Sequence, residues 1–129
     1  MVYRWVIMFG VICLAFAVLT VINFWQIDHV EGKTMFGLHF GSVWSFWSIY
    51  GLVVFPAVVF ANVLFWAIYY YGYHFWFKKL WIMQITTYAG GLIMMAIITW
   101  LWYGELPNKG TLVGIGLCAA GMLTSILWK

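Results

Sequence analysis

The run from Gly104 to Met122 decides the fold, and it reads GELPNKGTLVGIGLCAAGM. A polar turn containing Pro107 and Asn108 separates two long apolar stretches, and such turn residues end one helix before another begins. In the second stretch small residues recur at intervals of three and four, which places them on one face of a helix. The run therefore predicts a helical hairpin whose second helix carries a stripe of small side chains.

Two further apolar stretches precede this hairpin, so the sequence predicts helices over about 5–25, 43–72, 80–103 and 110–128. Each is long enough to cross the hydrocarbon core of a bilayer, which is about 30 Å thick. The connections are short, so consecutive helices must run antiparallel. We therefore predict an all-α fold: a polytopic, four-transmembrane-helix antiparallel bundle that forms a single integral membrane domain over residues 1–129.

The composition agrees with this class, because 67% of the residues are hydrophobic and only 7% are charged. A soluble domain carries about 25% charged residues, so this chain lacks the polar groups to cover a surface in water. Its six Lys and Arg residues are scattered and could line no groove, which argues against nucleic acid as a partner. The sequence contains no hydrolase elbow, phosphate-binding glycine loop or HExxH helix, so we expect neither an enzyme nor a cofactor.

The basic residues indicate how the helices are oriented. They divide four against two between the sides of the predicted bundle: Arg4, Lys78, Lys79 and Lys129 on one side, Lys33 and Lys109 on the other. Loops rich in Lys and Arg stay in the cytoplasm. We therefore expect both termini to be cytoplasmic, with the chain in a cell inner membrane.

The small residues of the last predicted helix form one stripe, made of Gly110, Gly114, Cys118, Gly121 and Ser125. Such a stripe lets two backbones approach closely within a membrane. It predicts an oligomer seam through this helix, in a homodimer or a hetero-oligomer. A contact with another helix of the same chain is the alternative interpretation.

Two features of the middle helices predict local departures from a straight rod. Pro56 removes one backbone hydrogen bond and should bend the helix that contains it. Gly90 and Gly91 stand together in the middle of the next helix, where they permit a kink. A hinge used in a transport cycle is one interpretation of this pair, and close packing against a bulky neighbour is the other.

The apolar stretches contain few polar side chains. The candidates for a substrate path are Asn23, Asn62, Gln84, Thr87 and Tyr88. Alternatively, these groups form hydrogen bonds with neighbouring helices. Asp, Glu, Lys and Arg are absent from the middle of every predicted span, and this argues against proton coupling through a buried carboxylate.

The longest polar stretch, residues 26–42, contains the only cluster of potential metal ligands. His29, Glu31 and His39 combine imidazole and carboxylate groups, which suit zinc or copper. Their spacing matches no zinc motif, so they are weak candidates and we expect no metal.

The last third of the chain resembles the small multidrug resistance family and the wider drug/metabolite transporter (EamA-like) superfamily. Gly104-Glu105 resembles the Gly-Glu turn that closes the third helix of that family. Gly114, Leu117 and Gly121 match its Gly-x-x-Leu-x-x-x-Gly segment, and the resemblance implies that this segment forms a dimer contact. It also implies a small four-helix unit that works in transport.

The resemblance extends upstream to Gly90-Gly91, which resembles the glycine-containing kink of the third helix, and to Trp100 near that helix's end. Two departures weaken the functional implication. The family's first helix carries a Glu that binds proton and substrate, whereas residues 9–21 here are uncharged. The family's aromatic positions in the third helix are occupied by Gln84 and Thr87.

These observations leave three hypotheses. The first is a drug/metabolite-transporter-like protein that moves an apolar or lipid-linked compound without buried-carboxylate coupling. The second is a non-catalytic structural subunit of a larger membrane complex. The third is a metal or redox membrane protein that uses the loop at 26–42. A polar cavity reached by Gln84 or Asn62 would favour the first, and aromatic faces pointing outward would favour the second.

Overall fold

The computed structural model describes residues 2–128, and it is built almost entirely of helices. The elements in chain order are α1 (Val2–Val30), β1 (Thr34–Met35), β2 (Leu38–His39), α2 (Val43–Tyr71), the π-helical segment η1 (Gly72–Phe77), α3 (Leu80–Tyr103) and α4 (Lys109–Leu127). The prediction of an all-α chain with four long helices is confirmed. Among the described residues, the only strands are β1 and β2, a short antiparallel pair between α1 and α2.

Three segments are long and apolar enough to cross a membrane: α1, α2 together with η1, and α3. The described part of α4 is a shorter apolar helix. Of the four predicted spans, three therefore have the length and apolar composition that a membrane crossing needs, and α4 is shorter.

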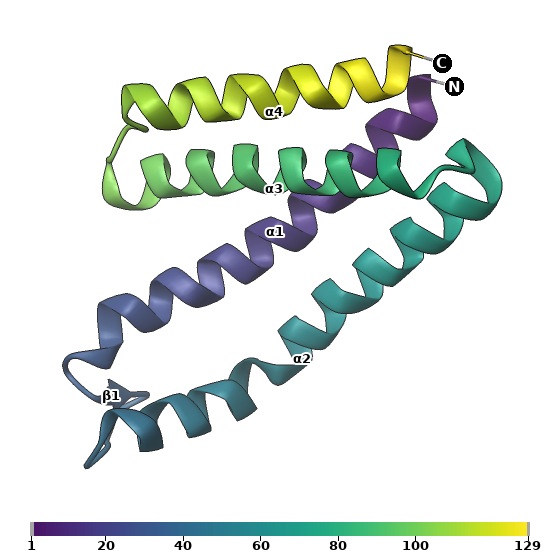
Figure 1. Ribbon diagram of the computed structural model, residues 1–129. Helices are drawn as coiled ribbons and strands as arrows, with labels where there is room; N and C mark the ends of the chain where they lie inside the picture. Colours follow the sequence, from purple (N-terminus) through teal and green to yellow (C-terminus); the bar gives the residue numbers. More distant parts are fainter. Residues whose placement is uncertain (1, 129) are drawn as a thin grey trace.

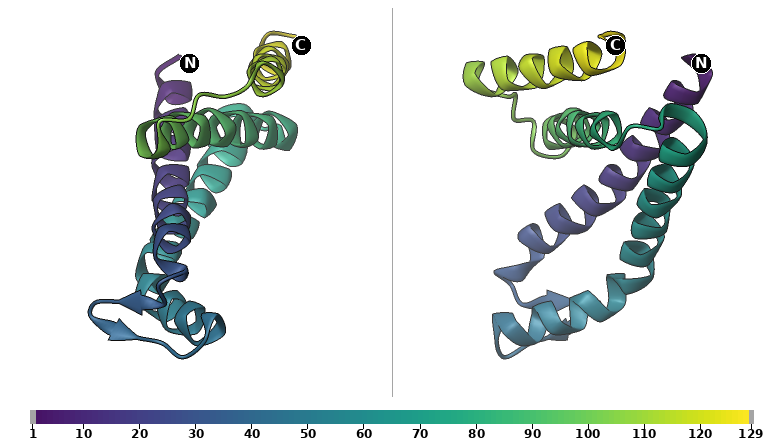
Figure 2. Two further views of the ribbon diagram at one scale, coloured as in Figure 1. Left: turned by 90° about the vertical axis from the view of Figure 1, so that its left-hand side faces the viewer. Right: turned by 45° about the vertical axis from the view of Figure 1, so that its right-hand side comes forward.

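The helices form an open stack in the order α2, α1, α3, α4 (Figure 1). The first two form an antiparallel hairpin, α3 crosses α1 obliquely, and α4 returns along α3 (Figure 2). The main packing contact of α4 is with α3, so the predicted antiparallel four-helix bundle is not confirmed. Short connections impose antiparallel neighbours, but they do not require the first and last helices to meet.

The first helix continues five residues beyond the predicted end at residue 25, as far as Val30. The ring of His29 stacks on Trp25 at a centroid distance of 3.9 Å, and its Nδ1 donates to the Trp25 carbonyl oxygen at 2.8 Å. These contacts one helical turn apart stabilise the last turn. In the same turn, Asp28 accepts hydrogen bonds from side chains of α3. The predicted loop is consequently shorter, and a two-stranded turn occupies its centre.

The second helix begins at Ser42, whose hydroxyl accepts a hydrogen bond from the Ser45 backbone N–H at 3.2 Å. It runs through Pro56, and Figure 2 shows α2 turning a corner part of the way along. Proline lacks the N–H of a helical hydrogen bond, so this bend agrees with the sequence. The sequence predicted that this helix ends at residue 72. Instead, the helical backbone continues beyond Tyr71 as the wider π-helical segment η1.

The buried core is small and consists of two clusters. One joins α1, α2 and α3 through Met8, Ile12, Ile68 and Met83. The other lies under the short strands and comprises Met35, Phe46 and Tyr50. The Tyr50 hydroxyl also donates to the Ile22 carbonyl oxygen at 2.5 Å, linking α2 to α1. Most other large apolar side chains lie on the outside.

Candidate functional site

The five residues predicted to form a substrate path do not line a common cavity. Asn23, Asn62, Gln84 and Tyr88 are exposed, and only Thr87 is buried. None of them lines either of the two principal cavities found in the described part of the chain.

Two of these five side chains are occupied by their own helices. Asn62 donates from Nδ2 to the Val58 carbonyl oxygen at 2.9 Å. Thr87 donates from Oγ1 to the Met83 carbonyl oxygen at 2.8 Å. Both bonds span four residues, so each of these side chains has a hydrogen-bond partner within its own helix.

Gly90 and Gly91 form the closest contact between α1 and α3. A Cβ atom at Gly90 would lie 2.9 Å from Ile12 Cγ2, and one at Gly91 would lie 2.5 to 2.8 Å from three ring atoms of Phe16. Helix α3 is continuous through both residues. This geometry favours the packing interpretation of the pair over the hinge, because the missing side chains create the space into which the aromatic ring fits.

The small-residue stripe of α4 lies along the margin of its contact with α3. Gly114, Cys118 and Ser125 are partly covered, whereas Gly110 and Gly121 are exposed. No atom lies within 4 Å of a Cβ atom built at Gly114 or Gly121. The stripe is therefore not used for close packing inside the chain, and much of it stays open.

The metal candidates in the first connection do not converge either. His29 is engaged with Trp25, Glu31 is exposed beyond the end of α1, and His39 lies on β2. Among residues 2–128 no group of three or more His, Cys, Asp and Glu side chains could hold a metal ion.

Asp28 has a structural partner that the sequence did not indicate. Its carboxylate accepts hydrogen bonds from Trp102 Nε1 at 2.7 Å and from the Tyr103 hydroxyl at 2.9 Å. Phe24 lies one turn earlier and packs against both rings. The last turns of α1 and α3 are thereby tied together by a carboxylate and two aromatic donors.

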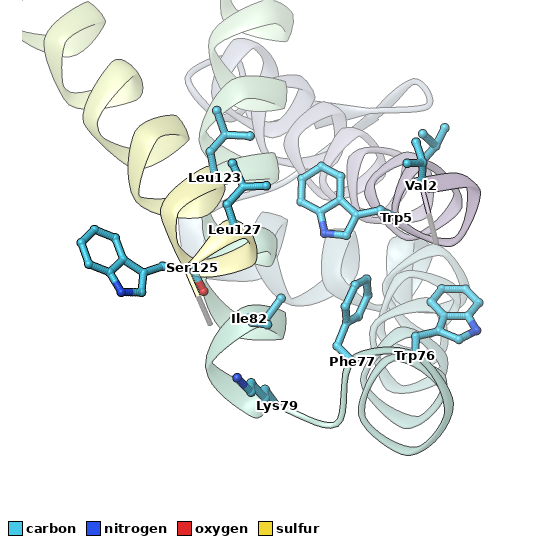
Figure 3. Close-up of a pocket in the computed structure, with 11 residues that line it drawn as sticks. Val2, Trp5, Trp76, Phe77, Lys79, Ile82, Leu123, Ser125 and Leu127 are labelled. Carbon is cyan, nitrogen blue, oxygen red and sulfur yellow. The ribbon is translucent and has the colours of Figure 1, made fainter.

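A large apolar cavity is the site that sequence reasoning missed. It has a volume of about 530 Å³ and lies where the start of α1, η1, the start of α3 and the end of α4 meet (Figure 3). Its walls include Trp5, Trp76, Phe77 and Ile82, and Lys79 lies at its edge. The aromatic and basic residues before position 80 were a usable indication, but their convergence with α4 depends on the tertiary fold.

A second cavity of about 400 Å³ lies beside the turn between α3 and α4. Its lining mixes apolar side chains of α3 with Glu105, Asn108 and Thr111. Asn108 is already engaged, since its Oδ1 accepts from the Thr111 backbone N–H at 2.8 Å and from the Thr111 hydroxyl at 3.0 Å. Two of the polar residues in the wall of this cavity, Asn108 and Thr111, thus form the N-terminal cap of α4.

Comparisons with known proteins add no assignment: no family model, no curated protein and no solved structure matches this chain. The resemblance to small multidrug resistance proteins therefore stays a prediction.

Proposed function

We propose that this chain is an integral membrane protein of the inner membrane that acts as a non-catalytic subunit and associates through α4 with a second copy of itself. The observation that carries the proposal is the position of α4 at the edge of the stack. It packs on α3, and there is open space around the Cβ positions of Gly114 and Gly121 in its small-residue stripe.

The distribution of apolar side chains supports a membrane location. Large side chains point outward along all four helices, among them Trp66 at 69% exposed, Leu101 at 73% and Leu117 at 69%. Water would penalise this surface at roughly 25 cal/mol for each Å² of apolar area, whereas lipid or another subunit would not. An exposed apolar patch of this extent is typical of membrane and subunit contacts.

The stripe supports self-association in particular. In lipid, helices gain little from apolar burial, so close approach at small residues becomes the main source of affinity. Gly121 is exposed, with open space around the position of a Cβ atom, so a partner backbone can approach it. Partners that would need a charged or polar contact are disfavoured, because the neighbouring surface of α4 is apolar at Leu117 and Val113.

The test compares two glycines of the same helix. Gly121 belongs to the stripe, whereas Gly116 lies on a different face, and both have open space around them. We expect Gly121→Leu to abolish the dimer in native mass spectrometry of the detergent-solubilised protein. Gly116→Leu should leave the dimer intact. Equal behaviour of the two variants, or a wild type that is monomeric in mild detergent, would contradict association through the stripe.

The second candidate function is transport of an apolar or lipid-linked compound, as in the drug/metabolite transporter superfamily. The specific observation in its favour is the cavity of about 530 Å³, whose size and apolar lining are typical of sites for small molecules. Against it stands the position of the five predicted path residues, none of which lines this cavity. Co-purification of other subunits at fixed stoichiometry would favour the subunit, and protein-dependent uptake into vesicles would favour the transporter.

A further inference from the structure

We propose that the cavity between α1, η1, α3 and α4 binds one acyl chain of an anionic phospholipid, whose phosphate group is held by Lys79. The inference rests on the membrane location proposed above.

The shape and lining of the cavity fit a hydrocarbon chain. Its volume of about 530 Å³ lies within the usual range for ligand sites. Trp5 and Val6 of α1, Phe77 of η1 and Ile82 of α3 contribute apolar side chains. Helix α4 completes the wall with Leu123 and Leu127. An acyl chain would replace empty space with apolar contacts on several sides.

The local backbone explains why the cavity exists. Six residues, Gly72–Phe77, adopt the wider π-helical turn, which is rare and concentrates at functional sites. A Cβ atom at Gly72 would overlap the Sδ and Cε atoms of Met83, so the end of this α3 side chain occupies the space beside the glycine. Lys78 then adopts a left-handed conformation with φ of 58°, and this turn carries the chain into α3. Trp76 and Phe77 are thereby placed on the cavity wall.

The polar groups at the cavity suit the head of an anionic lipid. Lys79 and Ser125 lie on one side of the cavity, opposite Trp5 and Phe77 (Figure 3). A lysine ammonium has three donors and no acceptor, and a serine hydroxyl can donate as well. Phosphate oxygens are acceptors only, so this pair complements a phosphate and not a cationic head group. Lys79 is itself exposed, so it can reach a head group at the bilayer surface.

The other charged residues near the cavity are also positive. Arg4 lies in the first turn of α1 and Lys78 precedes Lys79, so three cations gather around this end. The acids lie at the opposite ends of the helices: Asp28 is 24 residues along α1 from Arg4, or about 36 Å. Glu105 is separated from Lys79 by the whole of α3. At physiological ionic strength charges that far apart are screened within about 8 Å, so the cations stay unneutralised.

The experiment measures lipid binding to the full chain in detergent micelles by native mass spectrometry. Phosphatidylglycerol and phosphatidylcholine with identical acyl chains are titrated separately. We expect phosphatidylglycerol to bind with a Kd about fivefold lower or better, because a lysine near an anionic head group contributes about that factor. Lys79→Gln should reduce this preference to within about twofold. The matched control is Lys109→Gln, which removes the same charge at the far end of α3 and should keep the preference.

A second pair of variants tests the apolar part of the site. Leu123→Trp fills the cavity and should weaken both lipids together. Leu112→Trp, at an exposed position of α4 outside both the cavity and the small-residue stripe, should weaken neither. Glycerol phosphate without acyl chains should displace no bound lipid. Equal binding of the two lipids to the wild type, an unchanged preference in Lys79→Gln, or displacement by glycerol phosphate alone would each overturn the inference. If the chain fractionates with membranes while lipid binding fails, only this inference falls.

Discussion

At the scale of single residues, the fold depends on Gly90 and Gly91, whose missing side chains leave space for residues of α1. Phe16 of α1 occupies the space in which a Gly91 side chain would lie, and Ile12 and Phe9 do the same at Gly90. The contact brings α3 against α1 without a large hydrophobic core. A protein with so few buried side chains has little other packing that could compensate for a change here.

Gly91→Ala tests this contact. The added methyl group would lie 2.5 to 2.8 Å from the Phe16 ring, and such overpacking costs about 1–3 kcal/mol. Alanine recovers up to about 1 kcal/mol of helix propensity, so we expect a net loss of about 1–2 kcal/mol. Reversible unfolding in mixed micelles, followed by circular dichroism, measures the change.

The control for this substitution is Gly51→Ala on α2, where no atom lies within 4 Å of the added Cβ position. This variant should be as stable as the wild type or slightly more so. If both variants were equally stable, the ring of Phe16 would have to move freely, and the hinge interpretation of Gly90 and Gly91 would regain support.

Residue types predicted the glycine contact better than the polar path. Paired glycines permit either a hinge or close packing, and the sequence named both but not the aromatic partner. Asn62 and Thr87 were interpreted as groups facing a ligand or another helix. Each instead bonds the carbonyl oxygen four residues earlier, a local option that every helix offers and that spacing does not exclude.

At the scale of elements, the turn between α3 and α4 is the most completely specified part of the chain. Gly104 ends α3 with φ of 70°, a left-handed conformation that favours glycine. Its backbone N–H donates to the Trp100 carbonyl oxygen at 2.9 Å. Asn108 then caps α4. The sequence predicted this turn because each position carries a residue type with a known conformational role.

Asn108→Ala should destabilise the turn by about 1 kcal/mol, because the Thr111 backbone N–H loses its acceptor. Asn108→Asp should retain the stability, since a carboxylate accepts the same bond and also interacts favourably with the helix N-terminus. Thermal unfolding of the three proteins in one detergent gives the comparison. An alanine variant that unfolds at the wild-type temperature would show that the cap contributes nothing.

The connection between α1 and α2 was predicted less well, and the reason is physical. Polar residues after position 25 suggested a loop, but the stacking of His29 on Trp25 and the bonds of Asp28 to α3 extend α1 to Val30. Both effects need partners that composition does not reveal. Likewise, at the start of the π-helical segment Gly72 lies against Met83, a partner that only the tertiary structure provides.

At the scale of the whole molecule, the number of helices and their approximate positions followed from hydrophobic runs, whereas the arrangement did not. Four apolar helices can close into a bundle or stay open, and the difference depends on whether α4 finds a second neighbour. Here α4 packs on α3, and the two termini lie at the same end of the stack (Figure 2).

The positions of the termini lead to a prediction about topology. If all four helices cross the membrane, the termini lie on one side, together with Arg4, Lys78 and Lys79, and this side should be the cytoplasm. Green fluorescent protein fused to either end should then fluoresce, and periplasmic alkaline phosphatase fused to either end should be inactive. Opposite results at the two ends would mean that only the three longer helices cross.

The tie between Asp28 and α3 also has a consequence for the order in which the chain is made. Its partners Trp102 and Tyr103 follow 74 and 75 residues later in the sequence. At a synthesis rate of about 5–20 residues per second, roughly 4 to 15 seconds separate the carboxylate from its donors. During that interval α2 is the only long helix available to pack against α1. The hydrogen bonds from Asp28 to α3 can form only after Trp102 and Tyr103 have been synthesised.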